Sequence, residues 1–129
     1  MHNELTLNEY QKKAMTTCMK SSRNYSYMAG NLSAEVGELQ GKVNKAQRKE
    51  LLKFNEDGHI VWVAGKEDEI IFNEELKKEA GDVLWQLSGL CSVMGWSLEE
   101  VAQMNLDKLA ARKKAGTIIG NGDGIIREK

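Results

Sequence analysis

One eight-residue pattern, Leu-x-x-Glu-apolar-Gly-acid-apolar, is written twice in this chain, as LSAEVGEL at residues 32–39 and as LKKEAGDV at residues 76–83. Around each copy, apolar residues recur at helical spacing and form a stripe. Because residues three apart share one face of a helix, each copy places two carboxylates beside its stripe. The pattern therefore predicts two similar amphipathic helices, each with an acidic edge.

Four helices are predicted from apolar periodicity and capping signals, over about residues 7–20, 27–52, 73–95 and 97–116. Capping boxes open the first and the fourth helix, Asn73 is a plausible N-cap for the third, and a glycine ends each of the last two. The chain has no proline and is 29% charged, which is typical of a helix-rich soluble protein. We expect an all-α fold whose protomer is of the four-helix bundle type.

The length of the chain favours one domain over residues 1–129. Between the second and third helices, about residues 53–72 combine turn signals with β-branched and aromatic residues, which favours a small β-hairpin or an ordered loop. The glycine-rich tail, residues 116–129, lacks the Gly-Lys-Ser/Thr ending of a phosphate-binding P-loop. Cys18 and Cys91 lie in helical patterns and are expected to be reduced core thiols.

The net charge of −1 indicates neither a nucleic-acid-binding protein nor a membrane-surface protein. The sequence has no apolar run long enough to span a bilayer, and its polar start is not typical of a signal peptide. We therefore expect a cytoplasmic protein with no nucleic-acid or membrane partner.

The four acids of the repeated pattern are candidate metal ligands: Glu35, Glu38, Glu79 and Asp82. At about 100° per residue, the first acid of each pair lies roughly 60° from its stripe and the second roughly 120°, on the same side. If the two stripes pack together, the carboxylates gather along one edge, where they repel one another or take up protons. A divalent cation is the simplest remedy, and all-oxygen ligands favour Mg²⁺, with Mn²⁺ tolerated.

Other interpretations of these acids remain open. Acids beside an apolar stripe are often solvated flanking residues, although the duplication favours a site. A di-iron bundle would need Glu-x-x-His on facing helices, and that spacing occurs here once, from Glu56 to His59 in an apparent turn. Gly37 and Gly81 each cost up to about 1 kcal/mol of helix stability, which indicates close approach of another backbone or a ligand.

The predicted fourth helix carries polar residues on its apolar stripe, which we expect to face inward. Asn105 and Arg112 occupy stripe positions, and Lys108 lies close beside them. Buried polar groups need partners, so these residues either pair with acids of the other helices or bind an anionic ligand. Lys108 and Arg112, one turn apart, can grip phosphate oxygens, and metal-binding acids opposite such a pair suit phosphoryl chemistry.

Four segments together resemble the MazG-like nucleoside triphosphate pyrophosphohydrolases of the all-α NTP pyrophosphatase superfamily. These segments are LSAEVGELQGKVNKAQR, LKKEAGDVLWQLSGL, GWSLEEVAQMNLDKLAARKKAGTI and the tail GNGDG. The resemblance implies Mg²⁺-dependent hydrolysis of nucleoside triphosphates between the α and β phosphates. It also implies a helical bundle completed by dimerisation or tetramerisation, with the active site near the subunit contact.

The resemblance also implies roles for individual residues. The acids at 35, 38, 79 and 82 match the family's metal ligands, and Lys108 and Arg112 match a phosphate-binding pair. Asn105 is similar to a substrate-contacting position, and Lys45 and Arg48 match a basic pair that follows the first acidic motif.

The chain departs from the family pattern in three places. Ala34 replaces the first Glu of the acidic triplet, the inserted segment lengthens the gap between the acidic motifs, and extra residues precede Arg127, to which no role is transferred. Core packing is expected for Trp85 and Trp96, whereas Trp62 is either a loop anchor or part of a lid over the base. The alternatives to a general pyrophosphohydrolase are a nucleotide-selective, dUTPase-like enzyme and a non-catalytic helical assembly protein.

Overall fold

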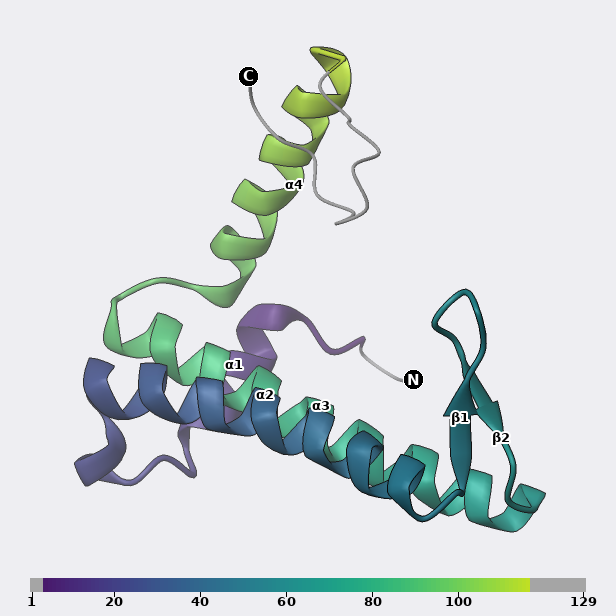
Figure 1. Ribbon diagram of the computed structural model, residues 1–129. Helices are drawn as coiled ribbons and strands as arrows, with labels where there is room; N and C mark the ends of the chain where they lie inside the picture. Colours follow the sequence, from purple (N-terminus) through teal and green to yellow (C-terminus); the bar gives the residue numbers. More distant parts are fainter. Residues whose placement is uncertain (1–3, 117–129) are drawn as a thin grey trace.

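The computed structural model describes residues 4–116 of the chain, and it is helical except for one hairpin (Figure 1). The elements in chain order are α1 (Leu7–Met15), the 3₁₀ turn η1 (Lys20–Ser22), α2 (Tyr25–Arg48), β1 (Leu52–Phe54), β2 (Ile60–Trp62), α3 (Lys66–Val93) and α4 (Leu98–Lys114). The all-α fold class and a hairpin between the second and third main helices are therefore confirmed. Residues 117–129 of the predicted glycine-rich tail, Arg127 among them, lie outside the described residues.

The body of the molecule is the pair of long helices α2 and α3, which run antiparallel and lie side by side along their length (Figure 1). At the hairpin end, Val43, Ala46 and Leu52 are buried, and partly buried residues pack around them: Leu51, Ile60, Trp62, Phe72 and Leu76. At the other end, Met28 is completely buried. The two predicted apolar stripes thus meet at Val43, Ala46 and Leu76. Val36 of the first stripe is 49% exposed and Met94 of the second is 42% exposed, so the prediction is wrong at these two positions within residues 4–116.

Helix α3 begins seven residues earlier than predicted, at Lys66 rather than near Asn73. Gly65 is its N-cap, and its first turn is acidic, which favours a helix N-terminus through the helix dipole. The β-branched run at residues 69–72 was therefore wrongly assigned to the insertion. Phe72 contacts the core beside Leu76, one turn away, so tertiary packing outweighs local β propensity here.

The insertion is consequently a short hairpin. Its strands pair antiparallel with Leu52 opposite Trp62 and Phe54 opposite Ile60. The turn uses Gly58 at φ 81°, a left-handed conformation that glycine adopts without strain. Trp62 packs edge-to-face on Phe72 of α3, with ring centroids 5.2 Å apart, so it anchors the hairpin to the body.

The first helix is shorter than predicted and ends at Met15. Its Gln11 joins three elements: Nε2 donates to Ser92 Oγ at 2.9 Å and to the Trp96 carbonyl oxygen at 3.0 Å, and Oε1 accepts from the Leu98 N–H at 2.7 Å. The capping box predicted at the start of α4 is present. Gln11 therefore fixes the corner at which α4 leaves the body.

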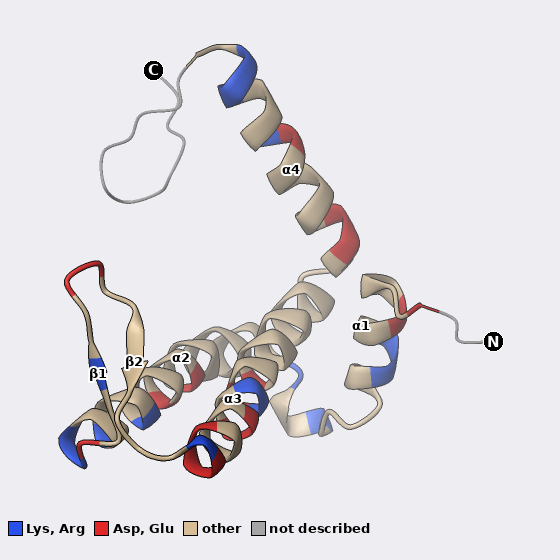
Figure 2. Cartoon of the chain, turned by 90° about the vertical axis from the view of Figure 1, so that its right-hand side faces the viewer, with Lys and Arg blue, Asp and Glu red and all other residues tan. Residues whose placement is uncertain are grey.

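Beyond that corner, α4 rises away from the α2/α3 pair, as two views at right angles show (Figures 1 and 2). Leu98 is buried, but Met104 is 70% exposed and Leu106 is 60% exposed. Asn105 is exposed as well. The prediction that the α4 stripe faces the core is therefore wrong at Asn105 within a single chain.

Cys18 and Cys91 are buried free thiols, as predicted. Burial, and then the charge of Glu100, raises the pKa of the Cys91 thiol, which keeps it protonated. Trp85 is half-buried and donates its Nε1–H to the Ala14 carbonyl oxygen at 3.1 Å, whereas Trp96 is 46% exposed, so core packing is wrong for Trp96. Among residues 4–116, no helix has the length and apolar character to cross a membrane.

Candidate metal and phosphate site

The antiparallel packing of α2 and α3 brings three of the four predicted acids together. Carboxylate oxygens of Glu35, Glu79 and Asp82 all lie within 4.8 Å of one another, and we call these three residues the acid cluster. Glu35 and Glu79 are half-buried, and Asp82 is exposed to solvent. The cluster therefore offers three oxygen ligands from two helices to one small ion.

The acid cluster perturbs the ionisation of Glu35, one of its two half-buried members. The pKa of Glu35 is raised above its ordinary value, first because burial disfavours the carboxylate and then because Glu38 lies nearby. The negative charges of Asp82 and Glu79 act in the same direction. A cation among these oxygens would remove the repulsion that produces the shift.

Glu38 lies beside the acid cluster without belonging to it. It is exposed, and its carboxyl group is within hydrogen-bonding reach of Glu35. The sequence prediction of four acids along one edge is therefore matched in part, with three converging and the fourth adjacent at the solvent side.

Unsatisfied oxygens test whether the acid cluster fits a cation. Glu35 Oε2 and Glu79 Oε2 are buried and accept no hydrogen bond from residues 4–116. Buried carboxylate oxygens without a donor are costly, and an ion supplies what the protein does not. The donors are all carboxylate oxygens, so the set fits a hard divalent cation better than zinc or copper.

Two residues next to the acid cluster were missed in the sequence. Tyr10 on α1 is half-buried, and burial and then the negative charge of Asp82 raise the pKa of its hydroxyl. Lys42 lies with Nζ 3.7 Å from Glu79 Oε1 and 3.9 Å from Glu75 Oε2. Lys42 could have been found from its position seven residues after Glu35, two turns along the same face, but Tyr10 has no local signal.

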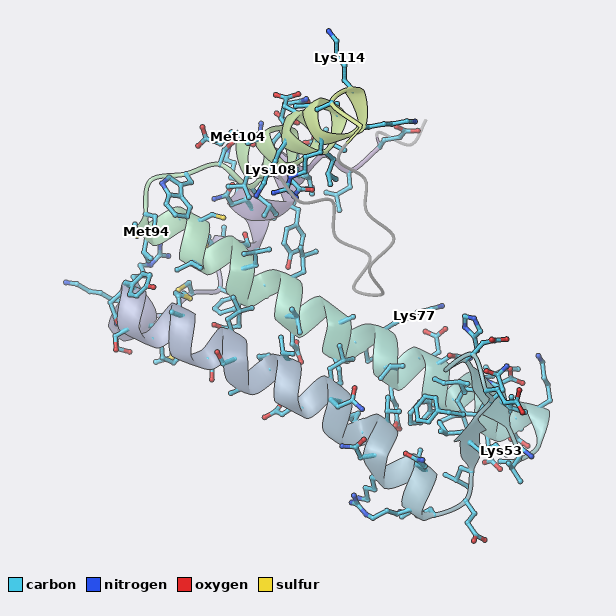
Figure 3. All side chains as sticks on the ribbon, turned by 45° about the horizontal axis from the view of Figure 1, so that its top comes forward. Lys53, Lys77, Met94, Met104, Lys108 and Lys114 are labelled. Atoms are coloured by element: carbon cyan, nitrogen blue, oxygen red, sulfur yellow. The ribbon has the colours of Figure 1, made fainter. Side chains whose placement is uncertain are left out.

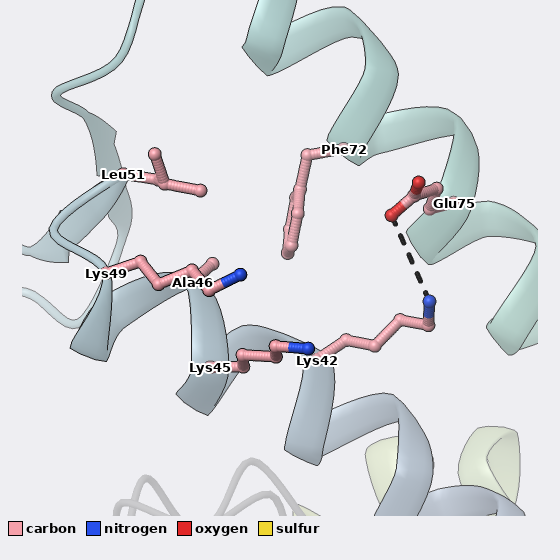
Figure 4. Close-up of a pocket in the computed structure, with 7 residues that line it drawn as sticks. All are labelled: Lys42, Lys45, Ala46, Lys49, Leu51, Phe72 and Glu75. Carbon is pink, nitrogen blue, oxygen red and sulfur yellow. Dashed lines mark ion pairs between the residues drawn. The ribbon is translucent and has the colours of Figure 1, made fainter.

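Lys45 and Arg48 lie near the C-terminal end of α2, as predicted. Lys45 lines a pocket of about 180 Å³ beside Phe72, together with Lys42 and Lys49 (Figure 4). Arg48 is exposed at the end of α2 and is not among the residues that line this pocket. The structure thus brings Lys45, but not Arg48, toward α3.

Within residues 4–116, Asn105 and Lys108 of α4 are not brought to the acid cluster. Figure 3 shows Lys108 and Met104 on α4, which stands apart from the α2/α3 pair. Among residues 4–116, no hydrogen bond or ion pair joins Asn105 or Lys108 to the four acids. Arg112 is half-buried on the same helix.

The structure tests the close approach that was predicted at the two glycines of the repeated pattern. A Cβ built at Gly37 or at Gly81 meets no atom of the described chain within 4 Å. Close approach of the backbone of residues 4–116 is therefore wrong as their explanation, and approach of a ligand or of another chain stays a prediction.

Together, the antiparallel helix pair and its acid cluster define an all-α protein with a carboxylate centre suited to a divalent cation. The family model of the MazG nucleotide pyrophosphohydrolase domain matches residues 23–117, so the chain belongs to that family. It is 35% identical to the Gene 37 protein of Mycobacterium phage L5 over 103 residues, which cover 80% of this chain and 78% of that protein. No solved structure matches the chain. The resemblance stated from the sequence is thereby confirmed.

Proposed function

We propose that the protein hydrolyses nucleoside triphosphates between the α and β phosphates, giving a nucleoside monophosphate and pyrophosphate, with Mg²⁺ as cofactor and Mn²⁺ as a substitute. The observation that supports this most directly is the acid cluster, in which two buried carboxylate oxygens lack donors, inside a MazG domain. Nucleoside triphosphates are cytoplasmic metabolites, so we propose a cytoplasmic location.

In this proposal Glu35, Glu79 and Asp82 hold the cation. A bound divalent cation supplies charge neutralisation on the phosphate oxygens. Glu38, exposed beside the cluster, orients a water molecule for in-line attack on the α phosphorus and accepts its proton. The new bond joins the water oxygen to the α phosphorus, and the bond to the oxygen that bridges the α and β phosphates breaks, so pyrophosphate leaves.

The basic residues of α4 act, in this proposal, on the acid cluster of a second copy. Trp96 and Met104 are 46% and 70% exposed and line one hollow together with Glu100 and Val101, so they form an apolar surface that the described residues leave uncovered. Packing α4 against another protomer would cover them and bring Asn105, Lys108 and Arg112 to the partner's substrate. We therefore propose a homodimer or a homotetramer.

The direct experiment is a panel of ribo- and deoxyribonucleoside triphosphates, assayed with Mg²⁺ for pyrophosphate and, separately, for inorganic phosphate. We expect pyrophosphate and a monophosphate in equal amounts. Glu38→Gln should lower turnover by about 100- to 10,000-fold, the range that a general base contributes, while leaving the helical circular dichroism unchanged. Release of inorganic phosphate alone, or wild-type turnover by Glu38→Gln, would contradict the assignment.

The same panel separates the alternatives. Turnover of one nucleotide far above the rest would indicate a nucleotide-selective, dUTPase-like enzyme on the same scaffold. No turnover, together with no stabilisation by Mg²⁺, would favour a non-catalytic assembly protein whose acids are only solvated.

A further inference from the structure

A basic pocket lies one helical turn from the acid cluster. It has a volume of about 180 Å³ and is open to solvent on one side. Figure 4 shows its lysines on α2 facing α3, with the Phe72 ring in the middle. The lining residues are Lys42, Lys45, Ala46, Lys49, Leu51, Phe72 and Glu75.

The charge inside the pocket is unbalanced. Three ammonium groups face one carboxylate, that of Glu75. Lys42 is shared between Glu75 and Glu79, and neither Lys45 nor Lys49 has a carboxylate oxygen within 4.0 Å among residues 4–116. Because Phe72 forms an apolar wall, the local dielectric is lower than in water and the pull on an anion is stronger.

The pocket and the acid cluster are joined through Glu79. Glu75 lines the pocket, Glu79 belongs to the cluster, and the two are four residues apart on α3, which is about 6 Å along the axis. Lys42 contacts both carboxylates. An elongated polyanion bound by a cation at the cluster can therefore extend directly into the pocket.

We propose that this pocket receives the terminal phosphates of the substrate, those that leave as pyrophosphate, and that Lys42 transfers its contact from Glu79 to them when a cation occupies the acid cluster. This inference rests on the proposed function. Lys42 is then a positioning residue that couples cation binding to polyphosphate binding, and the coupling acts equally in both directions.

The nucleobase suits this pocket less well. The Phe72 ring is already packed edge-to-face on Trp62, and the polar groups of the pocket are three ammonium groups and one carboxylate, with no amide or hydroxyl side chain to read a base edge. Three cations in a row complement a chain of phosphates.

The first experiment measures binding of inorganic pyrophosphate to the metal-free protein in EDTA by isothermal titration calorimetry. The variant Lys45→Gln/Lys49→Gln should weaken binding at least about tenfold, because two charge-assisted contacts are lost. Lys12→Gln/Lys13→Gln on α1 makes the same charge change on exposed lysines outside the pocket and should bind like wild type. Absence of pyrophosphate binding by wild type, equal binding by the pocket variant, or a phosphate-free nucleoside binding as tightly as pyrophosphate would overturn the proposal.

The second experiment tests Lys42 through Mn²⁺ affinity, measured from the electron paramagnetic resonance signal of free Mn²⁺. Lys42→Met keeps the length of the side chain and removes the charge that competes for Glu79. Mn²⁺ should bind about two- to fivefold more tightly, the range that a solvent-screened ion pair contributes, while pyrophosphate binding weakens. Unchanged or weaker Mn²⁺ binding would indicate a merely structural lysine and overturn the coupling.

Failure of the proposed cation site and failure of the pocket assignment give different results. If wild type binds no Mn²⁺, or if Glu79→Gln binds Mn²⁺ as wild type does, the proposed cation site is wrong. If Mn²⁺ binds at the acid cluster but the lysine variants leave pyrophosphate binding unchanged, the site stands and the pocket assignment is wrong.

Discussion

Gly89 on α3 faces Met28 on α2 so closely that a Cβ at position 89 would lie 2.4 Å from Met28 Sδ and 2.6 Å from Met28 Cε. Met28 is 7 residues before Glu35, and Gly89 is 7 residues after Asp82. Seven residues are about two turns of helix. In an antiparallel pair, this contact therefore sets the register that places Glu35 opposite Asp82.

Gly89→Ala tests that contact. The added methyl group must displace the Met28 side chain, which is completely buried and has little room to move. Overpacking costs about 1–3 kcal/mol, and the better helix propensity of Ala returns up to about 1 kcal/mol. We expect a net loss of about 1–2 kcal/mol, measured by urea unfolding in EDTA.

Gly41→Ala is the matched control for that variant. Gly41 is also inside a long helix, but no atom of the described chain lies within 4 Å of a Cβ built there. Gly41→Ala should leave the free energy of unfolding unchanged or raise it by up to about 1 kcal/mol. In the double variant Met28→Ala/Gly89→Ala, the second change should cost less than it does alone, because the clashing atoms are gone. Equal costs in both backgrounds would show that Gly89 does not act through Met28.

Glu35 gives the metal-free protein a pH dependence of defined sign. Its pKa in the folded state is raised above the ordinary value of 4.5, so the folded protein holds this proton more tightly than the unfolded chain. The stability that this contributes is fully present below pH 4.5 and is lost as the pH rises through the raised value. In EDTA, Glu35→Gln should therefore lose less stability than wild type over that rise.

Urea midpoints measured at a series of pH values check the prediction for Glu35. Glu56→Gln removes an exposed acid in the hairpin turn and should keep the wild-type profile. A Glu35→Gln profile parallel to that of wild type would mean that the acid cluster does not hold the proton. Saturating Mg²⁺ should flatten the wild-type profile at neutral pH, because the cation takes the place of the proton.

Divalent cations should stabilise the fold through the acid cluster. At 100 times its dissociation constant, a ligand that binds only the folded state adds about 2.7 kcal/mol, which for a chain of this size is a rise of about 10 °C in Tm. We expect this shift with Mg²⁺ and Mn²⁺ in wild type. It should be absent in Glu79→Gln, whereas Glu56→Gln should retain it. A shift that survives in Glu79→Gln would place the ion elsewhere.

The acidic edges were predictable because helical periodicity is local. Glu35 and Glu79 stand at fixed angles to stripes that can be read directly, and antiparallel packing of the two stripes leaves few arrangements. The start of α3 was not predictable in the same way, because residues 69–72 are locally β-favouring and the contact of Phe72 with Trp62 and the core is a tertiary one.

Features that depend on contacts between residues far apart in the chain could not be predicted from the sequence. The charge of Asp82 acts on Tyr10 because α1 packs on α3, and nothing in the sequence around Tyr10 signals this neighbourhood. Asn105 stands on an apolar stripe and is nevertheless exposed, since the corner set by Gln11 directs α4 away from the body. Periodicity identifies which face of α4 is apolar but not whether this chain or another covers it.

A shared active site can be tested by mixing two inactive variants. If α4 of one protomer acts on the acid cluster of its partner, Lys108→Ala and Glu79→Gln are each inactive alone, but a mixed dimer contains one site in which both residues are intact. After unfolding and refolding a one-to-one mixture, half of the dimers are mixed and activity should return to about a quarter of wild type. The matched control is a mixture of Glu35→Gln and Glu79→Gln, two changes in the same cluster. Its activity should not exceed the sum of the activities of the two variants measured separately. Recovery in neither mixture, with light scattering showing a monomer, would mean that Lys108 acts within its own chain or not at all.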